Sequence, residues 1–347
     1  MARVGILTFH YANNYGAVLQ AYGLATAVTA LGHSVEVIDY RPLSARRAYG
    51  RWPRDPRKVL PTAMARWRVR RFRQCHLPLS QHPYWTIEDL RHSPPKVDFL
   101  VCGSDQVWNV SSFRGFDPAF FFAFLNGDSP RRVSYAATFG YTDDLGDNRQ
   151  QISTLLSRFD HLSVRDIKSQ DMVGALTGRT AEHVLDPSFL TDYDPITPPR
   201  MIKGPYVVAY CLSDNDLFKA AVRTVRRRLG IPVISISRPF NEAKVTGSAG
   251  PQQWLSLMRH ADFVCTNSFH GVCFSLKNRK EFVALPTHRG QSRLEDVLET
   301  AGLPDRLVHS EEELDKAISC PVGYETAAPR LNEARERSLT FLREALR

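Results

Sequence analysis

A proline-rich segment, Thr191–Pro205, separates two parts of the chain that each alternate between short apolar runs and helical patterns. The segment holds four prolines and shows little periodicity. Because proline removes a backbone donor and fixes φ, we expect a linker there. Strands that alternate with helices form parallel sheets with right-handed crossovers. The sequence therefore predicts two successive doubly wound α/β domains, which also suits a length of 347 residues.

Strand and helix patterns give the extent of each domain. Strands are expected at Val4–Phe9, Ser34–Tyr40, Asp98–Cys102, Arg132–Ala136 and His161–Val164, and then at Tyr206–Leu212, Pro232–Ser237, Asp262–Thr266 and Glu281–Leu285. Near the end of the chain, the apolar residues that share one face of a helix are Leu331, Ala334, Phe341 and Ala345. We therefore expect domains at residues 1–192 and 206–325, a linker at 193–205 and an amphipathic helix at 326–347.

The positive charge of the chain is concentrated in one segment, a basic insertion at residues 41–75. Arg41–Arg73 holds twelve Lys or Arg and one acid, Asp55, whereas the rest of the chain has 33 basic and 35 acidic residues. Such a segment could meet nucleic acid, anionic lipid or an acidic substrate, or it could be a solvated insertion. No nucleic-acid recognition module is present in the sequence, so we expect no nucleic-acid partner.

Part of the basic segment has the pattern of an amphipathic helix. Met64, Trp67 and Phe72 would form its apolar face, on which Arg68 and Arg71 intrude. The N-terminal stretch lacks the pattern of a signal peptide, and no apolar run approaches the roughly 18 residues of a membrane span. The six cysteines show no paired spacing, which favours a reduced compartment. We expect a cytoplasmic protein in which the basic segment could touch the anionic inner face of a membrane.

The loop after the first strand, Phe9–Gly16, lacks a GxGxxG or P-loop pattern, so it predicts neither dinucleotide nor Walker-type chemistry. Asn13 and Asn14 tolerate left-handed backbone angles and can be explained as turn residues. Alternatively, these two amides and Tyr15 could hydrogen-bond to a polyol.

A second loop, GSDQVWN, directly follows the strand DFLVC. Ser104 and Asp105 are favourable helix caps, which is the structural interpretation. The same residues with Gln106 could pair with sugar hydroxyls, and Trp108 could cover an apolar sugar face.

The third loop, TNSFHG, lies between a strand that ends at Thr266 and a helix that begins near Gly271. His270 would therefore lie at a helix N-terminus, where unpaired N–H groups and the helix dipole favour anions. They also disfavour an imidazolium, so a neutral histidine that can accept a proton is expected. A lone histidine is often only a buried structural residue, but Asn267 and Ser268 add more polar groups than one cap needs.

Cationic side chains follow other strands. His288, Arg289 and Arg293 come after the strand EFVAL, and Arg165 comes after HLSV. Arginine suits bidentate capture of a carboxylate or phosphate, although each arginine alone is weak evidence in an arginine-rich chain. We expect no metal site, because the histidines are far apart in sequence and have no ligand spacing beside them.

Taken together, the loops match motifs of one known family. The matching segments are GILTFHYANNYGAVLQAYGL (Gly5–Leu24), DFLVCGSDQVWN (Asp98–Asn109), SYAATFG (Ser134–Gly140), LSVRD (Leu162–Asp166), LDPSFL (Leu185–Leu190) and ADFVCTNSFHGVCFSL (Ala261–Leu276). On these residues the chain resembles the polysaccharide pyruvyl transferase family. The resemblance implies a GT-B-like fold, in which two Rossmann-like doubly wound domains face a central cleft and the final helix packs back toward the N-terminal domain.

The resemblance also implies a reaction. The enolpyruvyl unit of phosphoenolpyruvate would move onto two hydroxyls of a sugar, giving a pyruvate ketal and phosphate. His270 matches the family's catalytic histidine and would act as acid and base, the acid role requiring that bound substrate anions raise its pKa. The residues expected to bind the donor are Arg165, Ser268, Gly271, Arg289 and Arg293. Phosphoenolpyruvate is a co-substrate in this scheme, and no cofactor or metal is expected.

The acceptor implied by the resemblance is a nucleotide-linked or lipid-linked sugar in the synthesis of an exopolysaccharide or another glycoconjugate. The residues expected to contact it are Asn13, Asn14, Tyr15, Ser104, Asp105, Gln106 and Trp108. Two alternatives remain open on the sequence. One is a GT-B glycosyltransferase with a nucleotide-sugar donor, which would also need cations. The other is a basic adaptor at a membrane surface, which rests only on residues 41–75.

Overall fold

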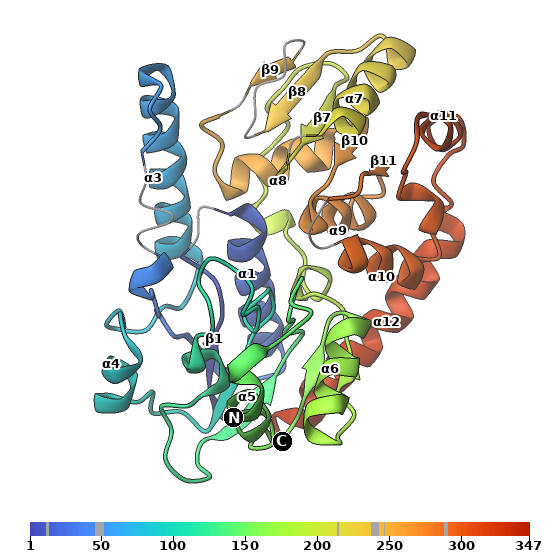
Figure 1. Cartoon of the computed structure of the whole chain (residues 1–347). Coiled ribbons are helices and arrows are strands. Elements are labelled where there is room, and N and C mark those ends of the chain that lie inside the picture. Colours follow the sequence, from blue (N-terminus) through green and yellow to red (C-terminus); the bar gives the residue numbers. More distant parts are fainter. Residues whose placement is uncertain (12–13, 46–51, 214, 237–242, 246, 288–290) are drawn as a thin grey trace. The chain divides into compact units, whose positions relative to one another are not determined.

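The computed structural model of the chain (Figure 1) describes residues 1–11, 14–45, 52–213, 215–236, 243–245, 247–287 and 291–347. The chain divides into two compact units. Unit 1 comprises Met1–Arg51, Arg70–Thr191 and Ala334–Arg347, and unit 2 comprises Trp52–Val69 and Asp192–Glu333. Two helices, α3 (Val59–His76) and α12 (Tyr324–Ala345), contribute residues to both units.

Unit 1 is built on a parallel sheet with the strand order β2-β1-β3-β4. Its strands are β1 (Arg3–Leu7), β2 (Ser34–Val37), β3 (Phe99–Cys102) and β4 (Arg131–Ser134). Isolated bridges connect β4 to a further parallel pair, β5 (Ser163–Val164) and β6 (Glu182–His183). The helices of this unit are α1 (Tyr15–Ala30), α4 (Ile87–His92), α5 (Arg149–Leu156) and α6 (Ile167–Thr177).

Side chains alternate across the sheet of unit 1 and fill an apolar core on each face. Phe99 and Val101 of β3 pack in one core, whereas Leu100 and Cys102 pack in the other. Burial on both faces is typical of parallel sheets covered by helices. The end of α12 and the residue after it belong to the first of these cores, where Leu342, Ala345 and Leu346 are buried.

Unit 2 contains a second parallel sheet, with the strand order β11-β10-β7-β8-β9. Its strands are β7 (Val207–Tyr210), β8 (Val233–Ile236), β9 (Ala243–Val245), β10 (Phe263–Thr266) and β11 (Glu281–Ala284). The helices that follow them are α7 (Asp216–Leu229), α8 (Pro251–His260), α9 (Phe269–Lys277), α10 (Gln291–Ala301) and α11 (Glu311–Ser319). Asn215 caps α7 by accepting a hydrogen bond from Phe218 N at 2.7 Å, and Gly230 ends this helix with φ +66°.

Every predicted strand is present, and the structure adds the short strands β6 and β9. Within the described residues, no helix is both long enough and apolar enough to cross a membrane.

Candidate functional site

Thr266, the last residue of β10, fixes the start of the loop that carries the TNSFHG motif. Its Oγ1 donates a hydrogen bond to Tyr210 O at 2.9 Å and accepts one from Ser268 N at 3.1 Å. Ser268 is the N-cap of α9, and its Oγ accepts a hydrogen bond from Gly271 N at 3.4 Å. The strand, the loop and the helix start are therefore joined by a short chain of hydrogen bonds.

Gly271 is required by a close approach of the loop to the helix. A Cβ at this position would lie 2.9 Å from the Cβ and 3.0 Å from the Cγ2 of Thr266, and nearer still to its Oγ1. Because these atoms belong to a branched side chain at a strand end, they cannot move aside without breaking the hydrogen bonds described above. The glycine therefore lets the first turn of α9 approach the end of β10.

Asn267 ties this loop to the loop that follows β7. Its Oδ1 accepts a hydrogen bond from Leu212 N at 2.8 Å, and its Nδ2 donates one to Ser213 O at 2.6 Å. Asn215 makes a similar connection, since its Nδ2 donates to Pro286 O at 3.2 Å in the loop after β11. Side-chain amides thus hold three loops together at the carboxyl edge of the sheet of unit 2.

His270 lies in the first turn of α9, and only 6% of its surface is exposed. Its ring packs edge-on against Phe269, with 5.2 Å between the ring centroids. The backbone N–H groups of a first helical turn and the helix dipole favour an anion at this position. The histidine is therefore held in a defined place beside a suitable anion site.

Arg293 lies in the first turn of α10, which follows β11, and it is 9% exposed. Since β10 and β11 are parallel neighbours, α9 and α10 both begin at the same edge of the sheet. The structure thus brings Ser268, His270, Gly271 and Arg293 to one edge of one sheet. Arg289 and His288 lie outside the described residues.

Arg165, which the sequence also assigns to the donor, lies in unit 1 and is fully enclosed there. Its Nη1 is 2.8 Å from Asp186 Oδ2, and its Nη2 is 3.5 Å from Asp105 Oδ1. Ser104 completes the cluster by donating from Oγ to Asp186 Oδ2 at 2.9 Å. Burial lowers the pKa of Arg165, but the nearby carboxylates of Asp186, Asp105 and Asp166 together outweigh burial and raise it. Arg165 is therefore a charged residue compensated by carboxylates of its own unit.

The loop GSDQVWN contributes Ser104 and Asp105 to the cluster around Arg165, and it contributes Trp108 to the core of unit 1. Trp108 is buried, its ring stacks on Phe121 with centroids 5.5 Å apart, and its Nε1 donates to Phe120 O at 3.2 Å. Gln106 is half-buried and its Oε1 accepts a hydrogen bond from Asn109 Nδ2 at 2.6 Å. Packing and hydrogen bonds within unit 1 therefore explain why Trp108 and Gln106 occupy these positions.

Asp105 has a left-handed backbone, with φ +84°. For a residue other than glycine, such a conformation costs about 1–3 kcal/mol and persists only where its surroundings enforce it. Two contacts hold Asp105 in this conformation, namely its backbone bridge to Ala137 and its ion pair with Arg165.

The loop after β1 has a similar structural explanation in its described part. Asn14 is the N-cap of α1, and its Oδ1 accepts a hydrogen bond from Gly16 N at 3.0 Å. Tyr15 is buried at the start of this helix, and Asn13 lies outside the described residues. The acceptor role of these residues stays a prediction.

A buried polar cluster at the carboxyl edge of unit 1 was not predicted. His10 Nε2 lies 2.9 Å from Asp39 Oδ1, and Arg41 Nε donates to the same oxygen at 2.7 Å. Burial would raise the pKa of Asp39, but the hydrogen bonds from His10 and Arg41 hold it well below its usual range. His10 follows β1 and Asp39 follows β2, so the order of two adjacent parallel strands could have revealed this pair.

No group of three His, Cys, Asp or Glu side chains within the described part of the chain could hold a metal ion. The prediction that no metal is needed stays a prediction.

Comparisons with known proteins are consistent with these features. A family model described as Polysaccharide pyruvyl transferase matches residues 14–289. Among solved structures, the chain is similar to UDP-GlcNAc 2-epimerase from Methanocaldococcus jannaschii, with a TM-score of 0.57 and 10% identity over 98% of this chain and 99% of that one. A search of curated proteins found no match.

Two further solved structures are similar. UDP-GlcNAc 2-epimerase from Neisseria meningitidis bound to UDP-GlcNAc has a TM-score of 0.55 and 8% identity over 100% of this chain and 99% of that one. The Thermobaculum terrenum O-GlcNAc transferase mutant has a TM-score of 0.44 and 16% identity, and this chain spans only 64% of its length. At such identities the likeness concerns the fold alone.

The two epimerase structures, together with two parallel sheets covered by helices, confirm the predicted GT-B-like α/β fold class. The family model covers most of the chain, from residue 14 in the loop after β1 to residue 289 in the loop before α10. The chain belongs to the polysaccharide pyruvyl transferase family.

Proposed function

We propose that this protein transfers the enolpyruvyl unit of phosphoenolpyruvate to two hydroxyls of a sugar, forming a pyruvate ketal and releasing phosphate. Membership of the polysaccharide pyruvyl transferase family is the observation that carries this proposal. The arrangement of His270, Ser268 and Arg293 at one sheet edge supports it, because the donor carries two anionic groups and reacts by proton transfer.

The proposed chemistry proceeds in two additions to the same carbon. The methylene carbon of phosphoenolpyruvate gains a proton, and one sugar hydroxyl adds to the neighbouring carbon as it loses its own proton. The carbon–oxygen bond to phosphate then breaks, and the second hydroxyl adds and loses its proton. One of the two hydroxyl protons balances the new methyl group, and the other leaves with phosphate.

His270, Arg293 and the first turn of α9 each have a proposed part in these steps. His270 donates the proton to the methylene carbon and accepts a proton from a hydroxyl. Arg293 pairs with the carboxylate or phosphate of the donor, and the first-turn N–H groups of α9 hold the other anion. A charge-compensated Arg165 would contribute to the fold of unit 1 rather than contact the donor directly.

We expect phosphoenolpyruvate to release inorganic phosphate only when a sugar acceptor is present. The experiment incubates the full chain with phosphoenolpyruvate and a panel of nucleotide-linked and lipid-linked sugars, and it measures phosphate and the mass of the pyruvylated product. Transfer of a glycosyl group from a nucleotide sugar, without any use of phosphoenolpyruvate, would contradict the proposal and favour glycosyl transfer.

Arg293→Met is expected to raise the KM for phosphoenolpyruvate by about 10- to 100-fold, because a hydrogen bond to a charged group contributes about 1.5–3 kcal/mol. Steady-state phosphate release measures this change. The matched control is Arg227→Met, which removes an arginine from the last turn of α7, away from the helix starts of the site. An unchanged KM in Arg293→Met would remove this arginine from the donor site.

A further inference from the structure

Helix α3, labelled in Figure 1, carries buried apolar side chains, among them Phe72, and several exposed ones. The sequence groups Phe72 with Met64 and Trp67, but the structure separates them. Phe72 lies five residues after Trp67, which is about 140° around the helix. Its ring is buried and packs against Tyr22 and His76, with centroids 6.1 Å and 4.7 Å away. Phe72 therefore packs the end of the helix in unit 1, and Arg68 Nη1 donates a hydrogen bond to Ser248 O in unit 2.

The outward face of α3 carries an exposed apolar stripe. It consists of Leu60, Met64 and Trp67, which are 69%, 39% and 57% exposed and are spaced by four and three residues. This spacing places the three side chains above one another on one side of the helix. Large apolar side chains that are exposed together, rather than singly, mark a surface that meets another apolar phase.

Cations surround this stripe. Exposed basic residues precede it at Arg57 and Lys58 and follow it at Arg70 and Arg71. The only acid in Arg41–Arg73 is Asp55, which accepts a hydrogen bond from Arg57 Nε at 3.1 Å. Apolar side chains between long cationic ones match the boundary of a bilayer, where acyl chains lie beneath anionic headgroups.

We propose that the α3 stripe is a membrane-contact surface that lies in the headgroup region of a bilayer rich in anionic lipid. Trp67 would occupy the interface, where tryptophan is enriched, and the cations would pair with lipid phosphates. A second copy of the chain is a poorer occupant, because a two-fold contact would bring two such cationic faces together. The inference is independent of the proposed reaction, since it concerns a surface and not the site at α9.

The full chain is expected to sediment with vesicles of equal phosphatidylglycerol and phosphatidylcholine, and to do so poorly with phosphatidylcholine alone. Leu60→Ser/Met64→Ser/Trp67→Ser should abolish measurable sedimentation. Arg57→Gln/Lys58→Gln should lower the partition coefficient roughly 25-fold, at about fivefold for each charge near the surface.

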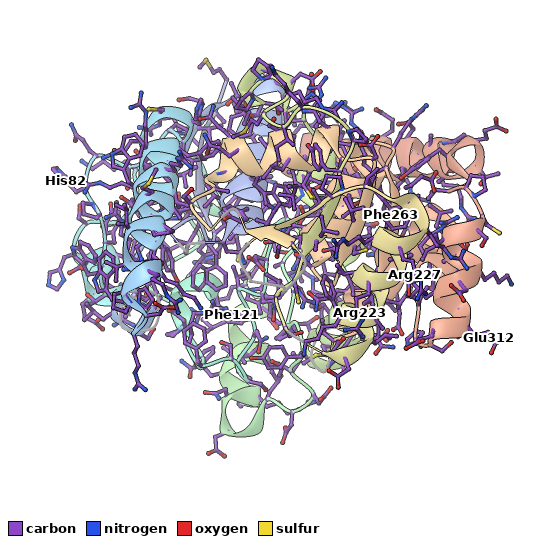
Figure 2. The ribbon with its side chains drawn as sticks, turned by 90° about the horizontal axis from the view of Figure 1, so that it is seen from above. His82, Phe121, Arg223, Arg227, Phe263 and Glu312 are labelled. Atoms are coloured by element: carbon purple, nitrogen blue, oxygen red, sulfur yellow. The ribbon has the colours of Figure 1, made fainter. Side chains whose placement is uncertain are left out.

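A variant of a different basic surface provides the control. Arg223→Gln/Arg227→Gln removes the same charge from α7; these two of its four arginines are labelled in Figure 2 and line a cavity of about 460 Å³. This control should change vesicle binding less than about twofold, given the local nature of surface electrostatics. All variants are compared at equal helix content by circular dichroism.

Three outcomes would overturn the inference. In the first, the serine variant sediments with vesicles as well as the parent protein. In the second, the α7 control loses as much vesicle binding as Arg57→Gln/Lys58→Gln. In the third, sedimentation velocity shows that the parent protein is a dimer and that only the serine variant is not. The last outcome would assign the stripe to a second copy of the chain. Phosphate release from phosphoenolpyruvate with a water-soluble acceptor is measured in parallel, so that failure of the membrane inference and failure of the proposed reaction are seen separately.

Discussion

His270→Ala is expected to lower kcat for phosphate release from phosphoenolpyruvate by about 10²–10⁴-fold, the usual contribution of a positioned acid or base. The ring is enclosed at the start of α9, and its polar neighbours serve mainly to hold loops together. Ser268 caps the helix, and Asn267 ties its loop to the loop after β7. His270 is therefore the side chain of this motif to which we assign proton transfer.

His270→Gln separates proton transfer from binding. Glutamine keeps a polar group that can hydrogen-bond to an anion, but it cannot exchange protons near neutral pH. We expect this variant to bind phosphoenolpyruvate within about threefold of the parent in calorimetry and to be as inactive as the alanine variant. The control His82→Ala, at an exposed histidine labelled in Figure 2, should keep full activity. Full activity of either His270 variant would contradict the assigned role.

The fold could be predicted from the sequence because its strands are short apolar runs in a regular alternation with helices. The alternation also predicts which loops lie at the same edge of a sheet, and these include the loops that lead to His270 and Arg293. The strands β6 and β9 were missed because these short segments, with the sequences EH and AKV, do not stand in an apolar run.

The contacts of individual side chains could not be read from the sequence in the same way. A tryptophan beside polar residues suits both a sugar platform and a core, and Trp108 lies in a core because three phenylalanines, distant in sequence, pack around it. Likewise, a glycine is required at position 271 because the backbone there lies close to the side chain of Thr266, and no turn pattern in the sequence predicts that contact. Arg165 follows a strand, as a ligand-binding arginine would, but the carboxylate of Asp186 reaches it.

Asp186→Asn is expected to lower the free energy of unfolding by about 3–5 kcal/mol, the cost of removing one partner of a buried ion pair. Asp186 Oδ2 accepts hydrogen bonds from Arg165 Nη1 at 2.8 Å and Ser104 Oγ at 2.9 Å. Its Oδ1 accepts a third bond from Ser188 N at 2.9 Å. Asparagine can keep the third bond, but its amide group would then face the donors of Arg165 and Ser104. Urea unfolding followed by circular dichroism measures the difference.

Asp192→Asn is the matched control for this change, because Asp192 is exposed and its Oδ1 accepts a similar local bond from Asp194 N at 3.0 Å. Its effect should stay within about 0.5 kcal/mol, as for most surface substitutions. The pair of variants also decides what Arg165 does. If Asp186→Asn left stability unchanged but altered the KM for phosphoenolpyruvate, Arg165 would belong to the donor site. A large loss of stability, with a normal KM in the fraction that remains folded, assigns the arginine to the fold of unit 1.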